Sequence, residues 1–286
     1  MDKLAKLREV VLGRMIDPQQ QQQLISAFSR IVVEFSFDNV LLEMGFGALL
    51  NLKINRLDRK FCYWLLTRVD LNSCLMVFGD GKELPLCPLQ WNLVLSIPYG
   101  RKTVPLVCDG VDESTQGRIR AIGGWFRMVD ASGRTHLPVG EVEKVFVSKL
   151  DKTKGKLRTE EDVVHFKSAY LVVLGQLLCP TTNGGNLSIS LLLAVSVAAK
   201  AENYNWCSFA FDWLMSYVSK FKGKFDKYNF VSGCGGCTIF LMMFYIDHLS
   251  LTPYYWNETP RINVWTQSDV MGVIEADRKA SRIMGS

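Results

Sequence analysis

Residues 204–222 read YNWCSFAFDWLMSYVSKFK and hold two tryptophans, three phenylalanines and two tyrosines. Four of these aromatic side chains recur at intervals of three, four and four residues: Trp206, Phe209, Trp213 and Tyr217. That spacing places the four on one face of an α-helix, with Ala210, Leu214 and Phe221 beside them. Apolar periodicity of this kind indicates burial, so we interpret the aromatic face as structural core rather than as a cofactor site.

The runs on either side of this stretch are strongly apolar. LSISLLLAVSVAA (187–199) precedes it and CTIFLMMFYI (237–246) follows it. Together they predict three apolar helices, over 187–201, 204–221 and about 234–249. Neither run reaches the ~20 apolar residues that a bilayer-spanning helix needs. We therefore expect buried helices and no contact with a membrane.

The N-terminal part of the chain also carries helical spacing. Residues 1–36 include DPQQQQQ followed by apolar residues three and four apart, which predicts a helical extension with one apolar face. Residues 37–70 show such spacing before and after Gly45 and Gly47. Because glycine marks bends and tight helix contacts, we predict a helix, a turn and a second helix here.

A short β-structure is predicted next. GDG (79–81) stands between two short apolar runs within residues 73–86, which is a hairpin signal. PLQWNLVLSIP (88–98) then predicts a short helix that Pro98 stops. Residues 99–139 hold glycine and proline at intervals, so we expect mostly loop with short helical pieces there.

The most polar stretch, KLDKTKGKLRTEED at 149–162, suits an exposed connection between two lobes. Thr159 and Asp162 at its end form a capping-box pattern that predicts the start of a helix. We therefore expect a mainly α, multi-helical and two-lobed protein with one or two short β-hairpins. Its expected parts are an N-terminal helical extension (1–36), a first helical lobe (37–150), a C-terminal helical lobe (151–251) and a C-terminal tail with a polar helix from about Ser268 (252–286).

Composition fits a folded chain of 286 residues. With 48% hydrophobic and 11% aromatic residues, the chain can bury a sizeable core, and disorder is excluded for most of its length. The net charge of +5 permits contact with an anionic surface but does not require it. The N-terminal MDKLAKLREVVLGRM lacks the continuous apolar region of a secretory signal, so we expect the nucleus or cytoplasm and no secretion.

The eight cysteines mostly lie in apolar runs, so we expect buried thiols and no structural disulfide. Cys234 and Cys237 in GCGGC form a Cys-x-x-Cys pair that could bind zinc or act as a redox dithiol. A zinc site needs two more ligands, and no second Cys-x-x-Cys or histidine pair occurs. A redox pair would prefer a βαβ context. We interpret the motif as a tight, glycine-rich helix start and expect no cofactor.

Catalytic signals are sparse. The chain has three histidines, at 136, 165 and 248, and no glycine-rich phosphate loop of either standard pattern. An enzyme would require a dispersed site, in which Cys179, His165 and an acid such as Asp162 meet within hydrogen-bond reach. We predict no catalytic residues and keep this arrangement as an alternative.

Two basic clusters are candidates for contact with phosphates: Lys149, Lys152, Lys154, Lys156 and Arg158 in the first, and Lys220, Lys222, Lys224 and Lys227 in the second. Specific recognition of nucleic acid would also want a known module or aromatic residues interleaved with the charges, which the first cluster lacks. A solvated linker is the plainer interpretation of the first cluster.

Several segments, taken in order, resemble the plant mobile domain family, also labelled aminotransferase-like, and in particular its divergent grass members. They are MGFGALLNLKINRLDRKFCYWLLTRVD (44–70), KELPLCPLQWNLVLSIPYGRKTV (82–104), LVVLGQLLCPTTN (171–183), YNWCSFAFDWL (204–214) and CTIFLMMFYIDHLSL (237–251). The resemblance implies association with plant transposons, and host-adopted relatives act in the nucleus in gene silencing and genome maintenance. It implies no catalytic residues, and no lysine here sits in a recognisable cofactor-binding context.

The expected function is therefore a non-enzymatic interaction or regulatory protein derived from a plant mobile element, with other proteins as its partners. The alternative is a factor that binds DNA or chromatin through its basic surface. An enzyme with a dispersed cysteine and histidine site is the third interpretation.

Overall fold

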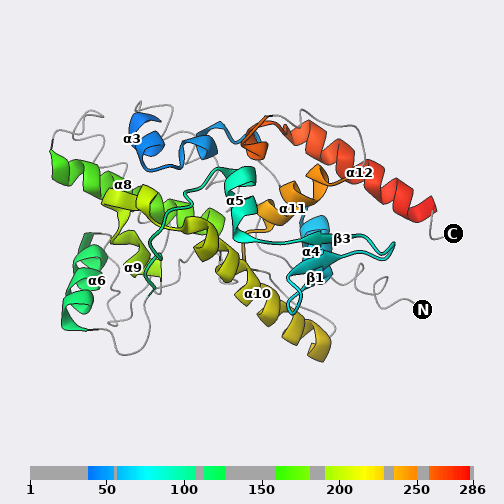
Figure 1. The fold of residues 1–286 in the computed structure, drawn as a ribbon, viewed down its shortest axis with the longest axis horizontal. Coiled ribbons are helices and arrows are strands. Elements are labelled where there is room, and N and C mark those ends of the chain that lie inside the picture. The colour runs from blue at the N-terminus through cyan, green and yellow to red at the C-terminus, as the bar shows by residue number, and fades with distance from the viewer. Residues whose placement is uncertain are drawn as a thin grey trace.

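The computed structural model of the chain describes residues 38–54, 57–106, 112–125, 159–180, 191–228, 235–249 and 258–283. In these ranges α-helices predominate, and one small antiparallel sheet lies beside them (Figure 1). The expectation of a mainly α fold with a short β-hairpin is therefore confirmed. The predicted N-terminal extension over 1–36 lies outside the described residues.

The predicted helix, turn and helix over 37–70 are present as α3 (Asp38–Glu43), the 3-10 helix η1 (Gly47–Asn51) and α4 (Arg59–Arg68). Gly45 turns the chain between α3 and η1 with a φ of +80°. A Cβ at this position would lie 2.7 Å from Cγ of Pro98. Only glycine tolerates both the positive φ and this close approach.

The sheet runs in the order β1 (Val69–Asp70), β2 (Leu75–Val77) and β3 (Glu83–Pro85). β2 and β3 form the predicted hairpin, with Met76 opposite Leu84. In its turn Gly81 has a φ of +81°, and the backbone N–H of Lys82 donates to the Asp80 carboxylate at 3.0 Å. β1 continues directly from α4 and was not predicted, because two residues are too few to show alternation.

The short helix predicted over 88–98 is α5 (Pro88–Leu95). Proline at its first turn and a capping box between Cys87 and Gln90 start it, and Ser96 ends it in the left-handed conformation. Trp91 anchors α5 inward, because its ring stacks on Phe240 with centroids 4.1 Å apart.

The interpretation of 99–139 as mostly loop misses a longer element, α6 (Glu113–Trp125). Asp112 begins this helix, since its carboxylate accepts from the Thr115 backbone N–H at 2.9 Å and from the Thr115 hydroxyl at 2.7 Å. The paired glycines at 123 and 124 hid the helical pattern, because glycine lowers helix propensity. Residues 126–139 lie outside the described part.

The capping box predicted at Thr159 and Asp162 starts α8 (Glu160–Leu178), with both reciprocal hydrogen bonds at 3.1 Å. The single helix predicted over 187–201 is wrong for the residues described. The chain forms α9 (Leu192–Val195) and then η3 (Ala198–Asn203), with Lys200 in a non-helical conformation. The Ser196 hydroxyl donates to the Leu193 carbonyl oxygen at 2.7 Å, a local bond that competes with helix continuation.

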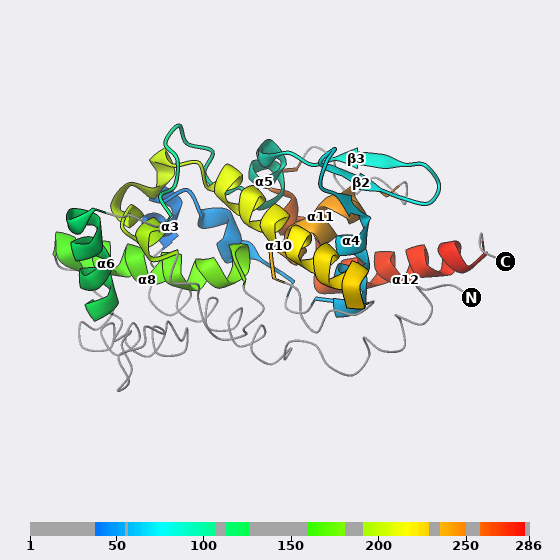
Figure 2. The same ribbon diagram turned by 90° about the horizontal axis from the view of Figure 1, so that it is seen from below.

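The other two apolar helices are α10 (Trp206–Tyr228) and α11 (Thr238–Asp247). All ten residues of α11 are buried, and α11 packs against α4 and α5. α10 packs against α5 and lies diagonally beside α4 (Figure 2). α10 runs beyond the predicted residue 221 to Tyr228, the last residue described there, so it continues through the second lysine cluster.

The C-terminal tail holds the 3-10 helix η4 (Arg261–Asn263) and the predicted polar helix, α12 (Gln267–Ile283). α12 buries Val270 and Ile274, and the Arg278 guanidinium pairs with the Asp58 carboxylate at 2.9 Å. Because Asp58 also caps α4, this ion pair joins the tail to the N-terminal part of the fold.

One hydrophobic core cluster contains residues from both predicted lobes and from the tail, among them Leu65, Leu214 and Ile274. The predicted junction between the lobes, at residues 150 and 151, lies outside the described residues. The division into two lobes therefore stays a prediction.

Candidate functional site

α10 carries two stripes of side chains. The first is fully buried against α5 and α4 and consists of Cys207, Ala210, Leu214, Val218 and Phe221. The aromatic face predicted from the sequence borders this buried stripe instead of forming its centre. Trp206 and Phe209 are buried, whereas Trp213 and Tyr217 are half-buried.

Trp206 is held on several sides. Its indole Nε1 donates to the Ala201 carbonyl oxygen at 2.9 Å, and its ring meets the edges of Phe46 and Phe209 with centroids 5.6 and 5.5 Å away. Trp213 is different, because its Nε1 has no acceptor among the described residues. The first half of the aromatic face is thus core, and the second half lies at the surface edge.

The aromatic face continues along α10 as a row of exposed lysines. Lys220, Lys224 and Lys227 follow Tyr217 at intervals of three, four and three residues. These intervals keep them on the same side of the helix. We call this surface the basic–aromatic stripe, and its members are Trp213, Tyr217, Lys220, Lys224, Lys227 and Tyr228.

Cations and rings lie close together within this stripe. Lys220 Nζ lies 4.6 Å from the ring centroid of Tyr217, and Lys227 Nζ lies 5.0 Å from that of Tyr228. The rings of Trp213 and Tyr217 are 5.6 Å apart. Tyr228 is 62% exposed at the end of the helix, which points away from the other helices (Figure 1).

Lys222 belongs to the same sequence cluster but not to the stripe. It lies near Asp70 of β1, whose pKa is lowered by hydrogen bonds from Ser73 and, to a smaller extent, by the charge of Lys222. The other basic cluster, from Lys149 to Arg158, lies outside the described residues. The structure therefore places only the second cluster.

Of the Cys-x-x-Cys pair, Cys234 lies outside the described residues, and Cys237 is buried as the N-cap of α11. Burial raises the pKa of the Cys237 thiol to about 12. Burial also raises the pKa of Cys179, and the neighbouring Cys237 adds to this effect. Both thiols are therefore protonated at neutral pH, the opposite of what a reactive thiolate requires.

The dispersed catalytic arrangement is not assembled. Asp162, His165 and Cys179 all belong to α8 or its C-cap. Since an α-helix rises 1.5 Å per residue, His165 and Cys179 are separated by about 20 Å along one straight element. Within the described residues there is also no group of three histidine, cysteine or acidic side chains placed to hold a metal ion.

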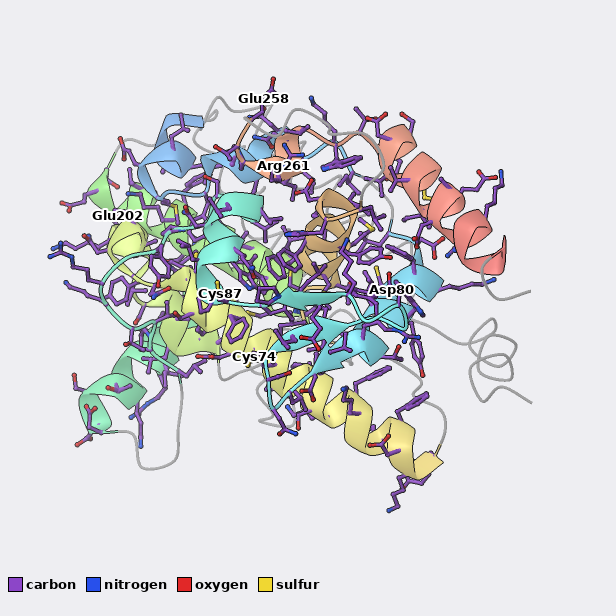
Figure 3. The ribbon with its side chains drawn as sticks, turned by 45° about the vertical axis from the view of Figure 1, so that its right-hand side comes forward. Cys74, Asp80, Cys87, Glu202, Glu258 and Arg261 are labelled. Atoms are coloured by element: carbon purple, nitrogen blue, oxygen red, sulfur yellow. The ribbon has the colours of Figure 1, made fainter. Side chains whose placement is uncertain are left out.

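α5 presents apolar side chains to solvent as well as to the core. Leu89 and Leu93 are 50% and 48% exposed and lie one helical turn apart. We call this pair the α5 ridge. It lies just after the exposed Cys87, labelled at the start of α5 in Figure 3. Sequence reasoning missed the ridge, although an eight-residue helix with leucines on opposite sides was a usable signal.

A buried ion pair joins α11 to the tail. The Arg261 guanidinium donates to both carboxylate oxygens of Asp247, at 2.9 and 3.1 Å, and Trp265 Nε1 donates to the same carboxylate at 2.7 Å. Arg261 also donates to the Glu258 carbonyl oxygen at 3.1 Å, and both residues are labelled in Figure 3. With every charged group paired, this network is a structural clasp.

Comparison with known proteins gives one match. A family model described as Domain of unknown function (DUF8566) matches residues 22–242. No curated protein and no solved structure matches the chain. None of the helices in the described ranges combines the length and apolar character that crossing a bilayer requires.

Proposed function

The chain belongs to the DUF8566 family, a domain of unknown function, and we propose that it is a non-enzymatic binding protein that acts through contacts with other proteins. The observation that carries the proposal is the α5 ridge. Leu89 and Leu93 present about half of their surface to solvent on a helix that is fixed from behind by Trp91. Because the two leucines lie one turn apart on the same helix face, they form a contiguous apolar patch, and exposed patches of this kind mark surfaces that partner proteins cover.

The spread of Asp162, His165 and Cys179 along α8 supports the non-enzymatic part of the proposal. The resemblance to the plant mobile domain supports an origin from a plant mobile element and a role in the nucleus or cytoplasm. The support comes from the segments at 44–70, 82–104, 171–183, 204–214 and 237–251.

The test is affinity purification of the tagged full chain from plant tissue after nuclease treatment, followed by mass spectrometry. We expect a defined set of proteins with the wild type and its loss with Leu89→Glu/Leu93→Glu. The matched control is Leu106→Glu/Met271→Glu, which adds the same charge at apolar side chains that are 42% and 39% exposed elsewhere. Circular dichroism of all three proteins shows whether the fold is kept.

Two results would overturn the proposal. If the Leu89→Glu/Leu93→Glu protein retains the same partners, the α5 ridge is not the interaction surface. If nuclease treatment removes every partner from the wild type, the purified proteins were joined through nucleic acid.

A further inference from the structure

The C-terminal half of α10 gathers positive charge on one face. Lys220, Lys224 and Lys227 are all exposed, and no ion pair involves them in the described part of the chain. Asp226 follows Lys222 by four residues and therefore shares the opposite side of the helix. The three lysines thus create a positive potential over about 10 Å of helix length without a neutralising carboxylate on their own face.

Aromatic rings border these lysines. Tyr217 lies under Lys220, and Tyr228 lies beside Lys227 with most of its surface open to solvent. Tyr217 is half-buried, so Tyr228 is the exposed ring of the stripe. Cations beside an exposed ring suit single-stranded nucleic acid, since phosphates meet the cations and an unpaired base stacks on the ring. Paired bases offer no such faces, so a duplex would use the lysines alone.

We propose that the basic–aromatic stripe of α10 binds single-stranded nucleic acid, with Lys220, Lys224 and Lys227 on successive phosphates and Tyr228 stacked on a base. The proposal goes beyond the protein contacts assigned to the α5 ridge and rests on a different element. The shared chemistry of RNA and DNA is the anionic backbone with exposed bases, and the experiment separates the two.

The test is fluorescence anisotropy of the full chain with labelled single strands of about 12 nucleotides, as RNA and as DNA of the same sequence, and with the DNA duplex. Three phosphate contacts on a single strand give a slope of log affinity against log salt near −2. We therefore expect the affinity for a single strand to fall roughly tenfold or more between about 50 and 200 mM salt.

Three variants locate the site. Lys220→Gln/Lys224→Gln/Lys227→Gln should remove most of the salt dependence and weaken binding at least about tenfold at low salt. Tyr228→Ala should weaken binding of single strands about fivefold or more with the salt slope unchanged, because stacking is not electrostatic. The control Lys53→Gln/Lys60→Gln/Lys200→Gln removes the same charge from exposed lysines outside α10 and should bind as the wild type does.

Four outcomes would overturn the proposal. The first is no binding by the wild type, and the second is equal weakening of binding by the stripe and control triple variants. The third is equal affinity for duplex and single strand together with no effect of Tyr228→Ala. The fourth is binding to phosphatidylserine vesicles that depends on the stripe, without binding to oligonucleotides. The Leu89→Glu/Leu93→Glu protein should bind oligonucleotides normally, so failure of the protein-contact proposal would not be mistaken for failure of this one. Unchanged circular dichroism verifies the fold of each variant.

Discussion

The two tryptophans of α10 contribute differently to stability. Trp206→Ala removes a buried ring together with its hydrogen bond to Ala201, so we expect a loss of ~3 to 5 kcal/mol in the free energy of unfolding. Trp213→Ala removes a half-buried ring whose Nε1 has no acceptor among the described residues. We expect a smaller loss in the free energy of unfolding, of ~1 to 2 kcal/mol. Urea denaturation followed by circular dichroism measures both, and equal losses would contradict this ranking.

The same helix shows which residue properties follow from sequence periodicity. Spacing of three and four identified an apolar face that includes Trp206 and Phe209, and both are buried. Periodicity did not decide which row of side chains forms the centre of the buried face of α10: the aromatic row, or the row of smaller side chains that includes Ala210 and Leu214. The neighbouring helices decide that: α10 packs against α5 and α4, and the row with Ala210 and Leu214 is the one that is fully buried.

Gly45 makes the turn between α3 and η1 with a positive φ. Gly45→Ala should lower the free energy of unfolding by more than ~1 to 2 kcal/mol, the cost of a left-handed residue with a Cβ, because the added carbon also meets Pro98. The matched change is Gly117→Ala within α6, where a Cβ meets nothing within 4 Å. It should raise stability by roughly 0.5 to 1 kcal/mol. Thermal melts of the two variants should therefore shift in opposite directions.

Most elements were predicted from local signals, and the misses have physical causes. The hairpin around Asp80, the capping box at Thr159 and the polar helix near Ser268 all depend on neighbouring residues, which a sequence displays directly. The break between α9 and η3 depends on a serine whose hydroxyl competes with the helix, and its outcome is set by packing. α10 passes residue 221 because Phe221 and Phe225 stack, with Tyr63 of α4 against Phe221.

Buried thiols make the whole chain sensitive to alkaline pH. Burial raises the pKa of Cys237 from its usual value of 9.0 to about 12, so the folded state keeps a proton that the unfolded state loses. Stability from this thiol is complete below pH 9 and is lost as the pH rises towards 12. Between these limits one such group contributes a slope of about −1.4 kcal/mol per pH unit.

We therefore expect the Cys237→Ala variant to lose stability less steeply than the wild type when both are measured above pH 9.0. Urea denaturation under reducing conditions at several pH values gives the two slopes. Removing the exposed Cys87 is the control for loss of a thiol as such. Equal slopes of unfolding free energy against pH for the wild type and Cys237→Ala would contradict the raised pKa of Cys237.

The candidate surfaces depend on the assembled molecule, and this is why the sequence could not specify them. In the sequence, Leu89 and Leu93 cannot be distinguished from leucines of the core. They are exposed because α5 packs on α10 and α11 through its other face. The lysines of α10 were visible in the sequence, but the face that they share with the exposed Tyr228 requires the helix to extend to that residue. No sequence motif predicts the ion pair between Arg261 and Asp247, because the two residues are 14 positions apart in the sequence.

The Asp247–Arg261 clasp has a practical consequence for anyone dividing this chain into pieces. The family match stops at residue 242, inside α11, so a recombinant fragment cut there would sever a helix that is buried throughout. A fragment cut at residue 257 would keep Asp247 and discard both Arg261 and Trp265, which strands a carboxylate in the interior. Expression trials and limited proteolysis should therefore treat everything through α12 as the smallest piece worth making.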